Sequence, residues 1–240
     1  MVTAVVTSGA LARVSAIGPY FAVATGPHPG GPGFRPMTDL YTDPEVLADG
    51  VRVVAGRLGG DQPRVAASAL HLGTASRLWS IALACAALTG RVPDLAPERL
   101  WWRLPPSGPL DLWLPDPREV DREPHPALHH TVIAENLTPW ADAIRRVSGV
   151  SPHTLRGNAA SALIGAHRVL LAGTPRTVLP VVPLVRALLD RPPLAGAGTT
   201  HHATPAEPLA YQRHSCCLYY RVPGAGTCGD CVLNLKEKTA

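Results

Sequence analysis

The sequence predicts an α+β fold with a predominantly α-helical body, a small β-hairpin and a short cysteine-rich C-terminal tail. Three patterns support this: helical apolar spacing up to about position 190, two strand-like segments around a Pro-Pro-Ser-Gly turn, and four of the five cysteines after position 215. Hydrophobic residues make up 46% of the 240 residues and charged residues 17%, so the chain can bury a core. Its 22 glycines and 26 prolines disfavour a long coiled coil or an uninterrupted helical bundle.

The first clear helix is predicted for residues 44–58. Asp43 can cap its N-terminus, a proline suits its first position, and a glycine follows its last apolar residue. A second helical region covers about 63–89 and has no polar side chain between positions 81 and 88. We expect that half to be buried and central, with Cys85 as a small core residue rather than a ligand.

A β-hairpin is expected within residues 99–115, where two partly alternating arms flank the turn. Its tryptophans are expected to pack against a helix rather than bind a ligand. Further helices are predicted at 128–137, 138–147, 151–172 and 178–190. These patterns divide the chain into a helical body (1–190), a loop or linker (191–210) and a C-terminal metal-binding segment (211–240).

Charge and hydropathy narrow the classes of function. The net charge of +4 comes almost entirely from arginine, and no dense basic cluster is present, so a nucleic-acid partner is not expected. The N-terminus lacks a basic signal region, and the most apolar later stretch is too short for a transmembrane segment. We therefore expect a cytoplasmic protein, in which reduced cysteines serve as ligands or catalysts rather than disulfides.

The tail cysteines have the spacing C-C-x10-C-x2-C, at Cys216, Cys217, Cys228 and Cys231. Four thiolates make a complete metal-ligand set. The glycines and proline of residues 223–226 can reverse the chain, and Gly229 allows a tight turn whose N–H groups point at sulfur. Adjacent cysteines are unusual for zinc and suit a larger [2Fe–2S] cluster, which is favoured, while zinc and disulfides stay open.

Residues 213–233 (RHSCCLYYRVPGAGTCGDCVL) resemble the C-terminal signature of the FhuF-type ferric-siderophore reductases. In that family the same cysteine spacing holds a [2Fe–2S] cluster, so the resemblance implies that Cys216, Cys217, Cys228 and Cys231 are its ligands. Residues 157–163 (GNAASAL) are similar to a Gly-Asn-containing helix of the family, although Arg156 stands where the family often shows Trp. The resemblance covers the tail closely and about 60–190 only in layout.

The resemblance implies a cytoplasmic ferric-siderophore reductase that transfers one electron from a [2Fe–2S] cluster to siderophore-bound Fe(III). Hard oxyanions such as hydroxamates hold Fe(III) tightly and Fe(II) weakly, so a hydroxamate siderophore is favoured and its reduction releases iron. No nucleotide-binding motif stands in a strand–turn–helix setting, so electrons are expected from a separate donor such as a ferredoxin or a flavin/NAD(P)H reductase. No catalytic residue beyond the cluster is expected.

Two alternatives stay open: a [2Fe–2S] electron carrier or sensor without a siderophore site, and a zinc-stapled binding module. Arg213 and Arg221 flank the first cysteine pair, so we expect them to stabilise a reduced cluster and raise its potential. His214 stands two residues before Cys216 and could lie near a cluster sulfur or the siderophore. Ligation by four cysteines remains favoured over a histidine ligand, because the cysteines already complete the set.

Overall fold

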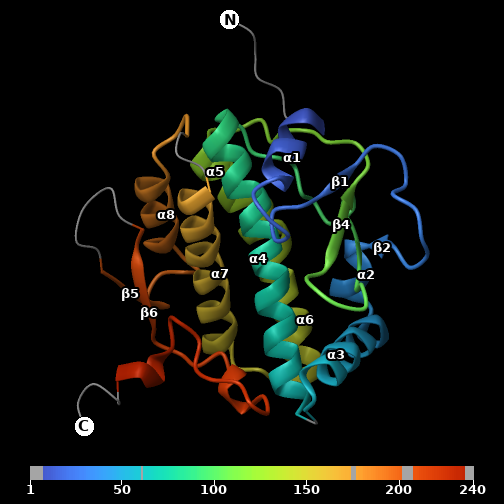
Figure 1. The fold of residues 1–240 in the computed structure, drawn as a ribbon, viewed down its shortest axis with the longest axis vertical. Coiled ribbons are helices and arrows are strands. Elements are labelled where there is room, and N and C mark those ends of the chain that lie inside the picture. Colours follow the sequence, from blue (N-terminus) through green and yellow to red (C-terminus); the bar gives the residue numbers. More distant parts are fainter. Residues whose placement is uncertain (1–7, 61, 174–176, 202–207, 236–240) are drawn as a thin grey trace, which may run out of the picture.

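The predicted α+β class is confirmed by the computed structural model, which describes residues 8–60, 62–173, 177–201 and 208–235. Helices dominate these ranges, and the strands are short (Figure 1). In chain order the helical elements of the body are α1 (Ser8–Ser15), α2 (Met37–Thr42), α3 (Pro44–Leu58), α4 (Pro63–Thr89), α5 (Pro124–Leu128), the π-helix η1 (His129–Leu137), α6 (Thr138–Ser148), α7 (Pro152–Gly173) and α8 (Val181–Leu189).

Helix α4 is the centre of the body and lies side by side with α7 (Figure 1). Every residue from Arg77 to Ala87 is buried, because α1, α3 and α6 also pack against this helix. The expectation of a buried, central helix is confirmed. Cys85 lies in this core, and burial raises the pKa of its thiol to about 11, so it stays protonated and is a poor metal ligand.

Helix α4 is also long and apolar enough to cross a membrane when judged by length and composition alone. The helix has the predicted bounds. Its wholly apolar stretch, residues 81–88, is too short to span a bilayer, whereas the window that meets the criterion covers 18 residues. In the structure, 72% of its most apolar window is buried inside the protein, as in the core helix of a soluble protein. No other helix within the described ranges meets the same criterion.

Helix α3 begins and ends where the sequence predicts. The carboxylate of Asp43 accepts hydrogen bonds from the backbone N–H groups of Glu45 (2.9 Å) and Val46 (3.2 Å). Gly59 closes the helix with a left-handed φ of 63°. Both ends therefore have partners for backbone groups that the helix itself leaves unpaired.

The predicted hairpin is present as β3 (Trp101–Arg103) and β4 (Asp111–Leu114), which pair antiparallel. Two N-terminal strands that the sequence did not predict extend it. β1 (Ala24–Thr25) pairs parallel with β4, and β2 (Arg35–Pro36) pairs antiparallel with β3, giving the order β1-β4-β3-β2. The indole N–H of Trp113 donates to the carbonyl of Gly26 (3.0 Å), so this ring fixes the N-terminal loop.

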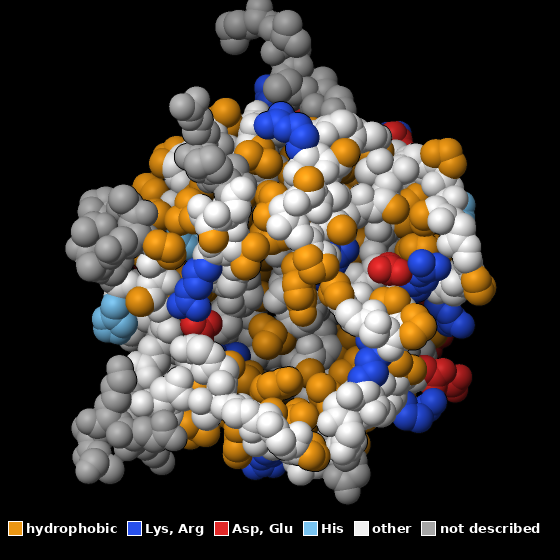
Figure 2. All heavy atoms as spheres, in the orientation of Figure 1, with side chains coloured by type: hydrophobic (Ala, Val, Ile, Leu, Met, Phe, Trp, Pro, Cys, Tyr) orange, Lys and Arg blue, Asp and Glu red, His pale blue; other side chains and the backbone are white. Residues whose placement is uncertain are grey.

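The segment 191–210, expected as a linker, carries structure of its own. β5 (Gly198–His201) pairs antiparallel with β6 (Ala210–Arg213), and the residues between 202 and 207 lie outside the described ranges. Leu194 and Leu209 are buried in the core shared with the helical body. On the face shown in Figure 2, hydrophobic side chains gather in a hollow over α4 and α7 that the C-terminal segment borders. The sheet of β5 and β6 therefore places the cysteine segment, which follows β6, against the helical body.

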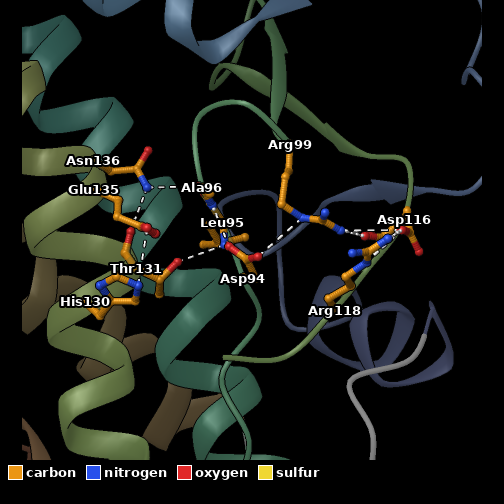
Figure 3. A network of polar contacts seen from close by, with 10 residues as sticks. All are labelled: Asp94, Leu95, Ala96, Arg99, Asp116, Arg118, His130, Thr131, Glu135 and Asn136. Atoms are coloured by element: carbon orange, nitrogen blue, oxygen red, sulfur yellow. Dashed lines mark hydrogen bonds and ion pairs between the residues drawn. The ribbon is translucent and has the colours of Figure 1, made fainter. Parts of the chain in front are cut away.

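The helix predicted at 128–137 forms with an unexpected π-helical geometry, between α5 and α6. The side-chain amide of Asn136 donates to the carbonyls of Thr131 (2.6 Å) and Leu95 (2.9 Å), and the Thr131 hydroxyl accepts from the backbone N–H of Leu95 (2.8 Å) (Figure 3). These buried bonds tie the wide helix to the loop after α4. Apolar periodicity cannot reveal the two bonds to Leu95, because they join residues 36 and 41 positions apart.

Two buried histidines make stability depend on pH. The ring of His71 stacks on Trp140 with 6.2 Å between centroids, and neither its nitrogens nor those of His167 have a hydrogen-bond partner among the described residues. Burial, assisted by the charge of Arg213, lowers the pKa of His71 to about 3. Burial, assisted by Arg168, lowers the pKa of His167 to about 4. Both rings are therefore neutral in the folded protein at neutral pH.

In the unfolded chain both histidines titrate near pH 6.5, so unfolding takes up protons as the pH falls below that value. The stabilising effect of keeping them neutral is therefore present above about pH 6.5 and is lost progressively down to the folded-state pKa. Each histidine lowers the free energy of unfolding by about 2 kcal/mol as the pH falls from 7 to 5. Urea unfolding at pH 7 and pH 5 measures this change. Between these pH values, the free energy of unfolding of a His71→Phe variant should fall by about 2 kcal/mol less than that of the wild type. An equal loss in both proteins would contradict this assignment.

Candidate metal centre

The four tail cysteines lie in one compact segment that follows β6. Cys216 and Cys217 precede the 3-10 helix η2 (Tyr219–Arg221), and Cys228 and Cys231 precede the 3-10 helix η3 (Val232–Leu235). Gly224, with a φ of 72°, reverses the chain between the pairs as the sequence predicts. The sulfurs of Cys217 and Cys228 lie 3.7 Å apart, so the turn brings together one member of each pair.

The sulfurs differ in exposure. Cys217 and Cys231 are buried, whereas Cys216 and Cys228 are half-buried and form the more open edge of the segment. Within the described residues, no three or more His, Cys, Asp or Glu side chains converge on a point suited to a single metal ion. Cys217 and Cys231 act electrostatically on Cys216, so the sulfurs form one electrostatic group.

Backbone N–H groups point at three of the sulfurs, and that of Tyr219 donates to Cys217. Leu218 donates to Sγ of Cys216 (3.3 Å), and Leu233 donates to Sγ of Cys231 (3.4 Å). Gly229 was expected to supply such donors, but the bonds to sulfur come from the residues two positions after each cysteine. Leu218 has a φ of 70° and is the one non-glycine residue of the described chain with a left-handed φ. Its strained backbone directs the N–H at Cys216.

The thiols of Cys217 and Cys228 are in hydrogen-bond contact. This contact lowers the pKa of Cys217 to about 6 and raises the pKa of Cys228. Burial is the largest cause of the raised pKa of Cys216. The positive charge of Arg213 acts on all three, and it favours their thiolate forms. A metal that binds here would displace these protons, as thiolate ligation requires.

A buried polar network anchors the cysteine segment to both central helices. The hydroxyl of Ser68 on α4 donates to the carbonyl of Cys217 (2.7 Å). Asn158 on α7 donates through its amide to the hydroxyl and the carbonyl of Ser68, both at 3.0 Å. The guanidinium of Arg213 donates to Oδ1 of Asn158 (2.7 Å) and to the carbonyl of Thr154 (3.3 Å). The Gly-Asn motif noted in the sequence therefore holds the cysteine segment in place.

Arg213 carries a buried positive charge without an anionic partner. Its side chain is 1% exposed, and none of the ion pairs among the described residues includes it. The nearby carboxylate of Asp230 pairs with Arg168 instead (2.7 Å). The Nε of Arg213 also has no hydrogen-bond partner among the described atoms. A buried charge without a counter-ion destabilises the folded protein, so a negative charge beside Arg213 would be stabilising.

Arg77 on α4 is also a buried arginine, but unlike Arg213 it has hydrogen-bond acceptors for Nε and both terminal nitrogens. Its guanidinium donates to three backbone carbonyls, those of Pro19, Ala22 and Leu110. Nε and both terminal nitrogens therefore have acceptors. Arg213 acts electrostatically on three of the four thiols, and its Nε lacks an acceptor. Its surroundings therefore fit a negatively charged four-thiolate group.

The other two residues expected near the cluster are placed differently. Arg221 is exposed, and its guanidinium donates to the hydroxyl of Tyr220 (3.1 Å) and to the side chain of Gln62 (3.4 Å). His214 is exposed too, with Nδ1 3.1 Å from the carbonyl of Gly196 and Nε2 2.9 Å from the hydroxyl of Thr199. Both imidazole nitrogens are thus engaged by the β5 side of the hairpin and leave none for a metal.

These features define an iron–sulfur type of site: a four-thiol segment with N–H groups on sulfur and a buried cation behind it. The family model described as the FhuF 2Fe-2S C-terminal domain matches residues 213–233. The resemblance to the FhuF type is thereby confirmed over this segment, and the match implies a [2Fe–2S] cluster as the cofactor. No curated protein matches the chain.

The segment can approach α7 only because position 157 lacks a side chain. A Cβ on Gly157 would lie 2.3 Å from Oγ of Ser215 and 2.9 Å from Nη2 of Arg213. Ser215 also donates to the carbonyl of His153 (2.8 Å), so the tail lies directly on the helix. Gly165, on the same helix, has no heavy atom within 4 Å of the corresponding position.

We expect Gly157→Ala to destabilise the protein by about 1 to 3 kcal/mol, because Ser215 and Arg213 must move apart. The matched variant Gly165→Ala should stabilise it by up to about 1 kcal/mol through helix propensity alone. Urea unfolding followed by circular dichroism measures both changes. A stabilising Gly157→Ala would show that the tail does not dock as described.

Proposed function

We propose that the protein is a ferric-siderophore reductase, in which Cys216, Cys217, Cys228 and Cys231 hold a [2Fe–2S] cluster. The observation that carries the proposal is the four-thiol segment that matches the FhuF 2Fe-2S domain and lies beside the unpaired, buried guanidinium of Arg213. When bound, such a cluster supplies or accepts one electron at a time. We place the protein in the cytoplasm, where its thiols stay reduced until they bind metal.

The proposed reaction adds one electron to siderophore-bound Fe(III) and yields Fe(II) and the free siderophore. A separate electron-donor protein, such as a ferredoxin or a flavin/NAD(P)H reductase, supplies that electron. No bond to carbon forms or breaks, so no general base or nucleophile is needed. Iron leaves because the hard oxyanions of the siderophore bind Fe(II) much more weakly than Fe(III).

The residues of this chain position the site and control its charge. Ser68 and Asn158 fix the carbonyl of Cys217, and Leu218 holds its N–H on Cys216. Cys217 and Cys231 are shielded from water, which strengthens local electrostatic effects. Cys216 and Cys228 are half-buried, so a redox partner can reach this side of the site without a conformational change.

The first test is the metal content of the purified protein. The proposal predicts a brown-red protein with about two irons and two sulfides per chain. A Cys228→Ser variant should lose the visible absorption and the reduction of siderophore-bound iron, while Cys85→Ala keeps both. A colourless protein with one zinc would support a zinc-stapled module and overturn the proposal.

The reaction itself separates a reductase from an electron carrier or sensor. Protein reduced with dithionite and freed of excess reductant should be reoxidised by a ferric siderophore, with about one Fe(II) captured by a chromogenic chelator per electron stored. Failure to reoxidise, with a cluster present, would leave the carrier or sensor function instead.

The burial of Arg213 predicts which arginine controls the potential. A reduced cluster carries more negative charge, so loss of a nearby buried cation lowers its midpoint. For Arg213→Gln we expect the reduced cluster to lose about 1 to 2 kcal/mol of stabilisation, which lowers the one-electron midpoint potential by roughly 40 to 90 mV. Arg213→Lys keeps the charge and should retain most of the potential, and exposed Arg221→Gln should shift it far less, because solvent screens that charge. In a redox titration, a larger shift for Arg221→Gln would refute this ranking.

A further inference from the structure

A cavity of about 450 Å³ lies beside the cysteine segment, between α6, the N-terminal part of α7 and residues 192–195. Its walls are mainly apolar, with side chains that include Leu137, Ala141, Leu155 and Leu194. A few polar groups reach it: Thr138, Asp142, Arg145, His153 and Arg156. This size and this mixture of apolar wall and few polar groups are typical of small-molecule sites.

The cavity adjoins the proposed cluster ligands. His153 forms part of its wall, and the carbonyl of His153 accepts the hydrogen bond of Ser215 (2.8 Å). Ser215 directly precedes the half-buried Cys216. The cavity lined by Arg221 and Pro223 also borders the segment, but it holds about 230 Å³, roughly half as much. The smaller cavity is lined by the segment itself, whereas the larger one reaches it through His153 and Ser215. The larger volume favours the first cavity as the place where a small redox partner is held.

The polar groups give this cavity a positive charge. Asp142 is its one carboxylate among the lining residues, and it pairs with Arg145 at 3.4 Å. Arg156 has no carboxylate partner among the described residues, and one of its terminal nitrogens contacts Nδ1 of His153 at 3.2 Å. Its Nε is buried and has no hydrogen-bond acceptor within the described chain. The free guanidinium capacity of Arg156 thus suits oxyanions.

We propose that this cavity binds the ferric chelate and that Arg156 selects chelates with net negative charge. The inference rests on the proposed function and names its substrate class. In a tris-hydroxamate complex the three ligand anions only balance the charge of Fe(III), whereas a tris-catecholate complex keeps a net negative charge. The cationic cavity therefore favours catecholate or carboxylate chelates over the neutral hydroxamate type that the sequence favoured.

Redox-inert gallium complexes test binding without electron transfer, because Ga(III) resembles Fe(III) in size and charge but is not reduced here. Isothermal titration calorimetry of the holoprotein would use Ga(III)-enterobactin, a trianionic tris-catecholate, and the neutral Ga(III) analogue of ferrichrome. The anionic complex should bind about tenfold or more tightly than the neutral one. Tighter binding of the neutral complex would overturn the selectivity.

Variants locate the site. Arg156→Gln should weaken binding of Ga(III)-enterobactin about tenfold and leave that of the neutral complex within about threefold. Ala141→Phe places a ring inside the cavity and should abolish binding of both complexes. The matched control Gly165→Phe fills a separate cavity, which is lined by Ile17, Phe21 and Val169, and should change neither affinity. Circular dichroism melts verify that each variant is folded.

The outcomes separate this inference from the proposed function. Binding that Arg156→Gln and Ala141→Phe leave unchanged would overturn the cavity assignment, even if the protein reduces ferric chelates. Binding that follows the predicted pattern would support the assignment. If the holoprotein then failed to reduce the iron complexes, the proposed function alone would fail.

Discussion

The C-terminal segment depends on one buried positive charge, that of Arg213. This residue ends β6, so the short sheet fixes where it enters the body. Its hydrogen bond to Asn158, and that of Asn158 to Ser68, join the sheet to α7 and α4 in turn. Taking a charge out of water without a counter-ion costs several kcal/mol. If the thiols beside it bind a metal, their deprotonation would supply the compensating negative charge, and fold and cofactor would stabilise each other.

The sequence predicted correctly those elements that depend on interactions between residues close together in the chain. The cap at Asp43, the hairpin around residues 101–114 and the buried centre of α4 all follow from side chains a few positions apart. The strands that were missed pair over long separations, as Ala24 does with Trp113. A two-residue strand has no alternation to detect, and its identity comes from its neighbour in space.

The candidate site divides in the same way. The spacing of the cysteines is a local pattern, which favoured a [2Fe–2S] cluster over zinc and disulfides, and the family match to this segment implies that cluster. Asn158 stood out in the sequence through its Gly-Asn motif, but its partner Ser68 lies 90 positions away and has no local signal. Arg213 and Arg221 looked equivalent in the sequence because both flank the same cysteine pair. Only the fold separates them, since β6 turns one inward and η2 leaves the other in water.

The left-handed backbone of Leu218 has a consequence for how the cofactor is acquired. Glycine would adopt this conformation freely, whereas leucine holds it at a cost of about 1 to 2 kcal/mol. A glycine would also let the loop sample many other shapes while it is empty. With leucine, the turn is set when the chain folds. If the four cysteines hold a cluster, its insertion would meet a preformed turn and would cost less conformational freedom than insertion into a glycine loop.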